Sequence, residues 1–260
     1  MSSTVHFPNF QGKHDEAPLV TPEQYLEYMK SIGKFPTIRP PEGVILCYAP
    51  RLLSHALNSH KMTKADGFLT KMHLLDETDG RIGIIGNFGI GSPVAVVILE
   101  ELIAFGVKKF ISIGTAGGLQ DDVQIGDIVV CDRAIRDEGT SHHYLPPSKY
   151  AHASKLLTEN LKERLDESNQ PYRVGASWTI DSIYRETVIE ARHYKDEGVL
   201  TVDMEASALF SVAAYRGVEV GAMFTVSDSL ARLKWEPNFH AKATKNGLEK
   251  IYQAAVQSLF

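Results

Sequence analysis

The sequence predicts an α/β protein in which a largely buried central sheet lies between layers of helices. Short apolar runs alternate with helix-length segments from residue 43 onward, a pattern typical of strands that are linked by helices. A length of 260 residues fits one large α/β domain. The hydrophobic content of 43% and the charged content of 23% are ordinary for a globular protein with a full core.

Residues 1–42 are expected to form an arm ahead of a single domain of residues 43–260. The arm contains one clear helix start, Thr21-Pro22-Glu23-Gln24. This is a capping box with proline at the first helical position. The helix is expected to end at Gly33, and a proline-rich link then leads into the domain.

Within the domain, apolar runs predict strands, and longer segments closed by glycine or polar residues predict helices. The expected strands are Gly43–Tyr48, Arg81–Gly86, Lys108–Gly114, Val123–Cys131, Val174–Thr179 and Val218–Val226. The expected helices are Ser92–Phe105, Ala151–Glu167, Asp203–Gly217 and Phe239–Ser258. Residues 115–118 and 137–150 are expected to be loops, the first because it is rich in glycine.

Two acidic clusters follow two of the apolar runs. Asp203-Met204-Glu205 lies where a β-branched run turns into an alanine-rich helix, and Asp228 ends the run that precedes it. Ligand crevices of open α/β sheets form at the carboxyl ends of strands. Charge at a helix N-terminus accounts for Asp203, but Glu205 is surrounded by apolar helix residues. Since a buried carboxylate needs partners, a ligand with hydroxyl donors would explain Glu205.

The bulk composition excludes several functional classes. A formal charge of −5 without a Lys/Arg block argues against a nucleic-acid partner. No apolar run approaches the ~20 residues of a membrane helix. The N-terminus lacks the apolar core of a signal peptide, and Cys47 and Cys131 resemble buried thiols more than a disulfide framework. We therefore expect a cytoplasmic protein with no membrane partner.

Two glycine-rich segments and a histidine pair contain residue types that can bind ligands. Residues 86–91 lack the GxGxxG spacing of a dinucleotide site and are better explained as a tight turn. Ile113–Gly118 would expose successive backbone N–H groups as an anion-binding nest, with Thr115 adding a hydroxyl. His142-His143 has no accompanying metal-ligand motif, so no metal is expected.

Taken together, these segments resemble the nucleoside phosphorylase family, which includes purine nucleoside phosphorylases, uridine phosphorylases and methylthioadenosine nucleosidases. The resemblance covers about residues 43 to 258. It is carried by the runs GVKKFISIGTAGGLQDDVQIGDIVV, RDEGTSHHY, VDMEASALFSVA and TVSD. The resemblance implies a three-layer α/β/α sandwich around a mixed, partly barrel-like sheet.

The resemblance also implies roles for individual residues. Glu205 matches the acid that binds the ribose hydroxyls, and Met204 matches the residue that packs against the sugar. Asp228 matches the acid that protonates a purine ring nitrogen. Gly117 lies in the loop shared by phosphate and base, and Trp178 falls where the family places an aromatic residue beside the base.

For phosphate, Thr115 matches a binding hydroxyl, and Arg51 falls where phosphorylases have an arginine after a Gly-Asp-Pro motif. The motif itself is replaced here by Cys47-Tyr48-Ala49, and the usual arginine two residues ahead of the glycine is replaced by Ser112. In relatives the adjacent subunit gives a second arginine, for which Lys64 is the nearest candidate here. Arg136, at the end of the next strand, is the candidate for the charge that is missing at Ser112.

The resemblance thus implies a pentosyltransferase that cleaves a purine ribonucleoside with phosphate as co-substrate, giving free base and ribose 1-phosphate. No organic cofactor is implied. A nucleosidase that uses water, a uridine phosphorylase (with Arg185 near the uracil-binding region) and a non-catalytic nucleoside-binding protein remain open. Relatives complete their sites across a dimer, so we expect a homodimer or a hexamer built as a trimer of dimers, with His6 or His14 reaching a neighbouring subunit.

Overall fold

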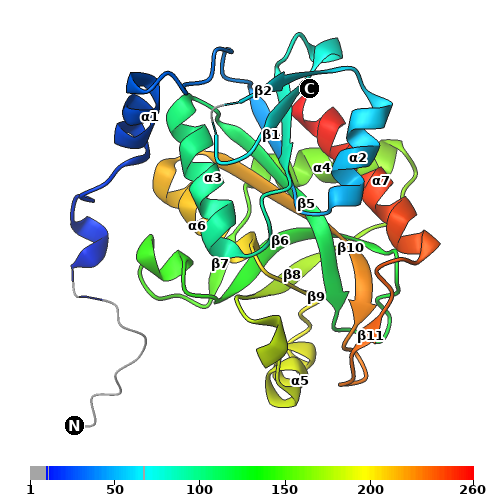
Figure 1. The fold of residues 1–260 in the computed structure, drawn as a ribbon. Coiled ribbons are helices and arrows are strands. Elements are labelled where there is room, and N and C mark those ends of the chain that lie inside the picture. Colours follow the sequence, from blue (N-terminus) through cyan, green and yellow to red (C-terminus); the bar gives the residue numbers. More distant parts are fainter. Residues whose placement is uncertain (1–9, 11, 67) are drawn as a thin grey trace.

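The computed structural model describes residues 10, 12–66 and 68–260, and within these it contains one mixed sheet flanked by helices (Figure 1). The strands are β1 (Gly43–Cys47), β2 (Met62–Ala65), β3 (Met72–Leu75), β4 (Ile82–Gly86), β5 (Lys109–Gly118), β6 (Ile128–Asp137), β7 (Tyr150–His152), β8 (Arg173–Ile180), β9 (Thr201–Asp203), β10 (Glu219–Ser229) and β11 (Glu236–Pro237). The α-helices are α1 (Pro22–Ser31), α2 (Pro50–Ser59), α3 (Ser92–Phe105), α4 (Lys155–Glu167), α5 (Val188–Asp196), α6 (Ala206–Arg216) and α7 (Lys242–Leu259). Short 3-10 helices are η1 (Lys13–Asp15), η2 (Asp76–Thr78), η3 (Ser141–His143) and η4 (Ile183–Arg185).

Part of the sheet closes on itself. β10 pairs with β5 in parallel and with β6 in antiparallel orientation. From β6 the pairing continues through β8 and β9 back to β5, so these strands form a ring. β1 and β4 extend the sheet from β5 in parallel, and β3 and β2 complete it in antiparallel orientation. The α/β class with a central mixed sheet is confirmed.

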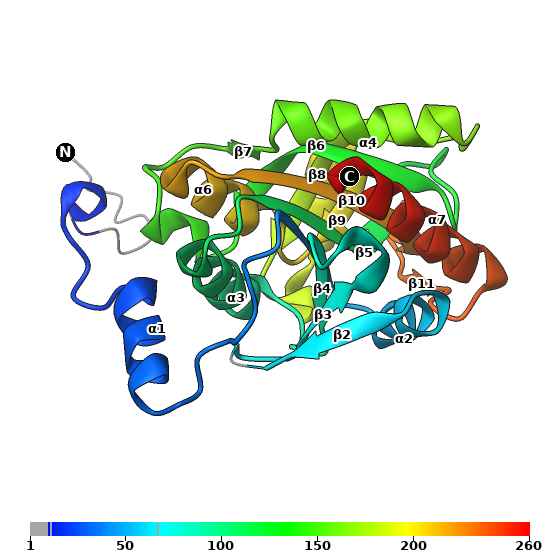
Figure 2. The same ribbon diagram turned by 90° about the horizontal axis from the view of Figure 1, so that it is seen from above.

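Helices cover both faces of this sheet (Figure 2). The alternate β1 residues Val44 and Leu46 belong to a core shared with α3 and α6. Ile45 and Cys47, which point to the opposite face, belong to a core shared with α2, α4 and α7. Because successive side chains of a strand face opposite sides, this division identifies three layers, as the family resemblance implied.

The helix in the N-terminal arm begins as its sequence indicates. The Thr21 side chain accepts a hydrogen bond from the Gln24 amide, and the Gln24 side chain accepts one from the Thr21 amide. This reciprocal cap satisfies two donors that a helix start otherwise leaves free. α1 then lies beside α3 (Figure 1). His14 Nε2 lies 3.1 Å from the carbonyl oxygen of His142, whereas His6 lies outside the described residues.

Several expected boundaries are wrong. The helix expected from Ala151 begins at Lys155, because Tyr150–His152 forms β7, and the helix expected from Phe239 begins at Lys242. Residues 115–118 are not a loop, because β5 continues to Gly118 and pairs with β9 and β10. β6 begins at Ile128 and not at Val123. The backbone turns at Gly126, where φ is 91° and an added Cβ would lie 2.7 Å from the Ala243 side chain. None of the helices in the described ranges is both long and apolar enough to cross a membrane.

Candidate functional site

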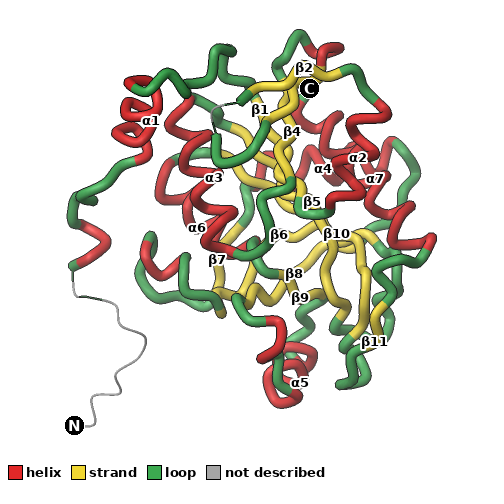
Figure 3. The backbone as a smooth tube through the Cα atoms, viewed as in Figure 1, coloured by secondary structure: helices red, strands yellow, loops and turns green. Residues whose placement is uncertain are grey.

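A cavity of about 670 Å³ lies at the carboxyl ends of β5, β9 and β10. It is lined by residues from segments that are distant in sequence: 48–49, 90, 114–117, 183–184, 186–188, 191, 202–205, 224, 227–228, 230, 233–235 and 239. β9, β10 and α5 lie on the same side of the molecule, the lower side in Figure 3. The volume and the position are typical of small-molecule sites in α/β proteins.

Gly117 lies between the two strands that carry the acidic clusters. In β5 it is the register partner of Val202 in β9 and of Asp228 in β10. An added Cβ at Gly117 would lie 3.0 Å from the Val202 side chain and 3.2 Å from Asp228 Oδ2. The glycine therefore serves close packing between neighbouring strands. Glu205 and Asp228 both line the cavity as a result.

Asp203 holds the turn between β9 and α6. One carboxylate oxygen accepts hydrogen bonds from the amides of Glu205 at 2.9 Å and Ala206 at 2.7 Å. The other accepts hydroxyl hydrogen bonds from Ser177 and Thr179, each at 2.8 Å. These contacts satisfy a buried charge and fix the first turn of α6, which sets the position of Glu205.

Glu205 is 7% exposed, and its Oε1 accepts a hydrogen bond of 2.6 Å from the Gly91 amide. Gly91 precedes α3 with a φ of 102°, a conformation that favours glycine. Burial raises the pKa of Glu205 to about 8, and the nearby charge of Asp203 adds to this shift. The carboxyl is thus rigidly oriented at the cavity wall. Met204 lines the cavity beside it.

Asp228 is 8% exposed and is oriented by a chain segment that folds back over it. Ser227 Oγ donates a hydrogen bond of 2.7 Å to Oδ1, and Trp235 Nε1 donates one of 3.0 Å to Oδ2. The return of the chain is fixed by β11, whose Pro237 is the register partner of Asp228. Both carboxylate oxygens therefore have a donor within the protein.

Glu186 is a cavity residue that the sequence did not reveal. It lies between η4 and α5 and lines the cavity together with Asp228. Burial raises the pKa of Glu186 to about 7, with the charge of Asp228 as the second cause. The one sequence signal near Glu186 is the capping box of Thr187 and Glu190, which marks the start of α5 directly after Glu186. Arg185 lines a separate pocket with Asp181 and Glu190.

The part of the cavity nearest to β1 contains Thr115, Tyr48 and Ala49. Ser112 Oγ donates a hydrogen bond of 3.3 Å to Tyr48 Oη, so the two residues that depart from the phosphate motifs contact each other. Lys234 is the sole lysine or arginine among the described residues that line this cavity.

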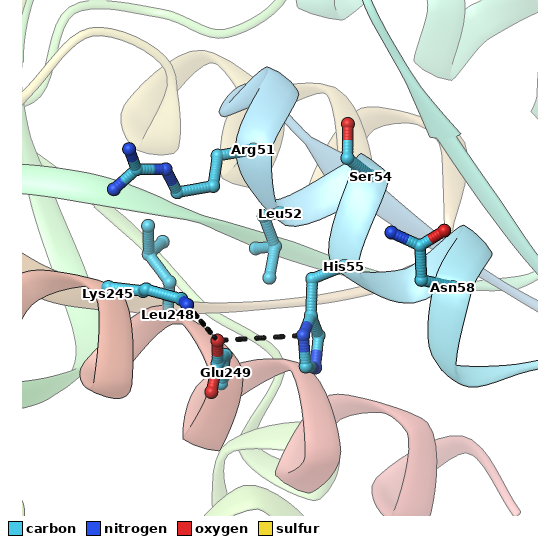
Figure 4. A pocket seen from close by; sticks show the side chains of 8 residues that line it. All are labelled: Arg51, Leu52, Ser54, His55, Asn58, Lys245, Leu248 and Glu249. Carbon is cyan, nitrogen blue, oxygen red and sulfur yellow. Dashed lines mark ion pairs between the residues drawn. The ribbon is translucent and has the colours of Figure 1, made fainter.

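The structure does not bring Arg51 into this cavity. Arg51 lines a separate pocket of about 360 Å³ between α2 and α7 (Figure 4). In that pocket Glu249 Oε1 lies 3.6 Å from His55 Nδ1 and 3.7 Å from Lys245 Nζ. The α2 cap, Ala49, does line the larger cavity, so the helix start and the arginine side chain face different spaces.

Trp178 is not a cavity residue either. Its ring is fully buried, lies 4.9 Å from the Tyr194 ring and donates a hydrogen bond of 2.8 Å to Asp137 Oδ2. It packs in one cluster with Val202 and Ala191, which do line the cavity. Trp178 therefore supports the cavity wall from behind.

Neither Arg136 nor Lys64 lines this cavity. Arg136 is buried, and its guanidinium donates to Ser141, Leu145, Pro146 and Ser148. It holds the 141–148 segment together. Lys64 on β2 is exposed, and the pKa of its ammonium group is lowered by Lys71. The described residues contain no cluster of His, Cys, Asp and Glu suited to a metal ion.

Comparison with known proteins gives a consistent picture. The family model described as the phosphorylase superfamily matches residues 49–259. A Bacillus cereus protein named purine nucleoside phosphorylase DeoD-type is 32% identical over 208 residues, covering 74% of this chain and 88% of its own length. A Halorubrum lacusprofundi protein named guanosine phosphorylase is 33% identical over 152 residues, covering 58% and 63%.

Solved structures agree with the fold. A purine nucleoside phosphorylase from Toxoplasma gondii in complex with immucillin-H superimposes with a TM-score of 0.74 at 20% identity, covering 85% of this chain and 91% of that one. A uridine phosphorylase from Vibrio fischeri ES114 gives a TM-score of 0.70 at 27% identity, covering 86% and 91%.

Proposed function

The chain belongs to the phosphorylase superfamily, and we propose that it is a pentosyltransferase that cleaves the N-glycosidic bond of purine ribonucleosides with phosphate. The products are the free base and ribose 1-phosphate. The observation that supports this proposal most strongly is that Glu205 and Asp228 line one cavity of nucleoside size. One carboxyl faces the sugar and the other faces the base.

The sugar end of the site is assigned to Glu205 and Met204. As the bond to the base breaks, positive charge develops on the ribose ring. A carboxyl group that is fixed by Gly91 and held at the cavity wall orients the ribose hydroxyls through hydrogen bonds, so the sugar is held in place as this charge develops. Met204 packs against the apolar face of the sugar.

The base end is assigned to Asp228, with Gly117 as the close-packed floor beneath it. A purine leaves more readily when N7 is protonated during bond cleavage. General acid catalysis of this kind is typically worth ~10²–10⁴-fold in rate. Trp235 and Ser227 hold the Asp228 carboxyl in place, so its orientation does not have to be created when substrate binds.

The phosphate end is assigned to Thr115 and to the start of α2, whose cap residue Ala49 lines the cavity. Pro50 has no N–H and the amides of Leu52 and Leu53 donate to the Ala49 carbonyl, so the start of α2 would favour an anion mainly through the helix dipole. The position of Arg51 in a separate pocket means that phosphate would be held mainly by neutral donors in the isolated chain.

A nucleoside panel tests this function directly. Purified protein would be incubated with inosine, guanosine, adenosine and uridine, with and without phosphate, and the products would be separated. We expect free purine base and ribose 1-phosphate to form from a purine nucleoside when phosphate is present. Free ribose formed equally well without phosphate would contradict the proposal.

Among the residues that the structure describes, no arginine lines the cavity, and this favours a nucleosidase as the second candidate. Such an enzyme uses water as the nucleophile and needs no anion-binding cation. Release of free ribose in the same panel would identify it. A uridine phosphorylase is the alternative for the base, and cleavage of uridine with little cleavage of purine nucleosides would identify that function.

We further propose that the chain acts in the cytoplasm in nucleoside salvage, as a homodimer or a hexamer built from dimers, and without a metal or organic cofactor. The exposed side chains Ile183, Tyr184, Val188 and Ile189 near the cavity mouth support an assembly that covers them. Light scattering would measure the oligomeric state, and activity after dialysis against a chelator would test the metal independence.

A further inference from the structure

Two carboxyl groups converge at the base end of the cavity from different parts of the chain. Asp228 comes from the end of β10, and Glu186 comes from the segment between η4 and α5. Both line the cavity, and the charge of Asp228 acts directly on Glu186. Like charges in one site oppose each other, so the charge of Asp228 disfavours the ionised form of Glu186.

The surroundings of these two groups differ. Asp228 accepts hydrogen bonds at both of its oxygens, and the Trp235 indole can act only as a donor. These two donors fix the orientation of the Asp228 carboxyl. Glu186 is partly withdrawn from water beside a second acid, which raises its pKa to about 7. In pairs of this kind, the group whose surroundings disfavour charge holds the proton.

We propose that Glu186 stores the proton that the departing purine receives, and that Glu186 and Asp228 act together at the base end of the cavity. The inference deepens the proposed function and rests on it. It assigns a catalytic part to a residue that none of the sequence motifs marked.

The C1′–N9 bond breaks, and its electron pair stays with the base. A phosphate oxygen forms the new bond to C1′. The proton leaves Glu186, either directly or through Asp228, and forms an N–H bond at N7, so the base departs as a neutral purine. The carboxyl pair then regains one proton from solvent before the next turnover.

The remaining titratable side chains that line the cavity are Tyr48, Tyr184, Asp203, Glu205 and Lys234. Among these, Glu205 has a pKa of about 8, raised by burial, and thus titrates in a neighbouring range. Because Glu186 acts in its protonated form, kcat/KM should fall as pH rises through about 7. Replacing Glu186 separates its contribution from that of Glu205.

The experiment compares Glu186→Gln with the unmodified chain on inosine and on 7-methylinosine from pH 5 to pH 9. N7 of 7-methylinosine already carries a methyl group and a positive charge, so its cleavage needs no acid. We expect kcat/KM for inosine at pH 6 to fall by at least ~10²-fold. For 7-methylinosine, kcat/KM of the variant should stay within about threefold of the value for the unmodified chain. The fall in kcat/KM for inosine near pH 7 should be absent in the variant.

Glu190→Gln is the matched control. Glu190 lies in the first turn of α5, the helix that follows Glu186, and its side chain accepts a hydrogen bond from the Thr187 amide. It does not line the cavity. It should leave both substrates unaffected. Equal losses on the two substrates in Glu186→Gln would show that Glu186 only positions the nucleoside and would overturn the proposal, as would an unchanged rate on inosine.

The failure of the proposed function itself would look different. An unmodified chain that cleaves no purine nucleoside, or cleaves it equally without phosphate, would already show that failure before any variant is compared. The ratio between inosine and 7-methylinosine in the variant reports on Glu186 alone.

Discussion

The hydroxyl of Ser112 donates a hydrogen bond to the phenol oxygen of Tyr48 at 3.3 Å, which joins the two positions where this chain departs from the phosphate motifs of its family. Tyr48 packs edge-on against Phe88, with ring centroids 5.2 Å apart. Its Cδ2 lies 3.3 Å from the place where a Cβ on Gly114 would be. Burial raises the pKa of Tyr48 far above its usual range, so phosphate would meet a neutral phenol there.

Restoring the family arginine alone should therefore damage the protein. Ser112 is 1% exposed, and an arginine at this position would be overpacked against Tyr48 and carry an unpaired buried charge. We expect Ser112→Arg to lower the free energy of unfolding by roughly 2–4 kcal/mol, measured by denaturant titration. The double variant Ser112→Arg with Tyr48→Gly should recover part of this loss and lower the KM for phosphate. An equally unstable double variant would show that the two side chains do not share this space.

Asp228→Asn should reduce kcat for inosine by ~10²–10⁴-fold with folding intact. The amide oxygen can still accept the hydrogen bond from Trp235, which preserves the loop that returns through β11. Thermal unfolding would verify the fold, and Trp235→Phe would report the effect of losing only the orienting contact. An Asp228→Asn enzyme with an unchanged kcat would remove Asp228 from the acid machinery.

Glu205→Gln should increase stability at alkaline pH while it abolishes efficient turnover. The pKa of Glu205 rises from 4.5 to about 8 in the folded chain, so its stabilising contribution is complete below pH 4.5 and is lost as pH rises through about 8. Glutamine has no charge to lose, and it still accepts the Gly91 hydrogen bond. Relative to the unmodified chain, the variant should gain on the order of 1–3 kcal/mol between pH 5 and pH 9. If the free energies of unfolding of the variant and of the unmodified chain changed in parallel from pH 5 to pH 9, Glu205 would not become a buried charge in this range.

Substitutions of Thr115 and Arg51 are expected to have different effects on the KM for phosphate. Thr115→Val keeps the shape of a residue that lines the cavity but removes its hydroxyl, so the KM for phosphate should rise about tenfold, the cost of one hydrogen bond to a charged group. Arg51→Ala should leave it within about twofold, because the guanidinium lines the α2–α7 pocket. A large rise in Arg51→Ala would mean that the arginine turns towards phosphate in the assembled enzyme.

The parts of this protein that sequence reasoning predicted well depend on local signals. α3 has the predicted bounds, Ser92–Phe105, because proline and glycine mark its ends. Asp203 caps α6 as a carboxylate at a helix start should. Asp228 was found because it ends an apolar strand that is buried on both faces.

The parts that were missed depend on contacts between distant segments. A glycine required by close packing, such as Gly117 in β5, has the same local appearance as a glycine required by a turn. Glu186 becomes notable only when the fold places it beside Asp228. Trp178 and Arg51 occupy positions that match family motifs. The direction of each side chain depends on its neighbours in the fold, which no local sequence pattern specifies.

The absence of a side chain at Gly117 has a consequence for the whole reaction centre. A single methyl group there would push against Val202 on one side and against Asp228 on the other, at 3.0 and 3.2 Å. Since Val202 leads through Asp203 into Glu205, a methyl group at Gly117 would press on both chain segments that carry the carboxyl groups of the site. An alanine at this position would remove no catalytic group, but its neighbours would have to move by a few tenths of an ångström to accept it.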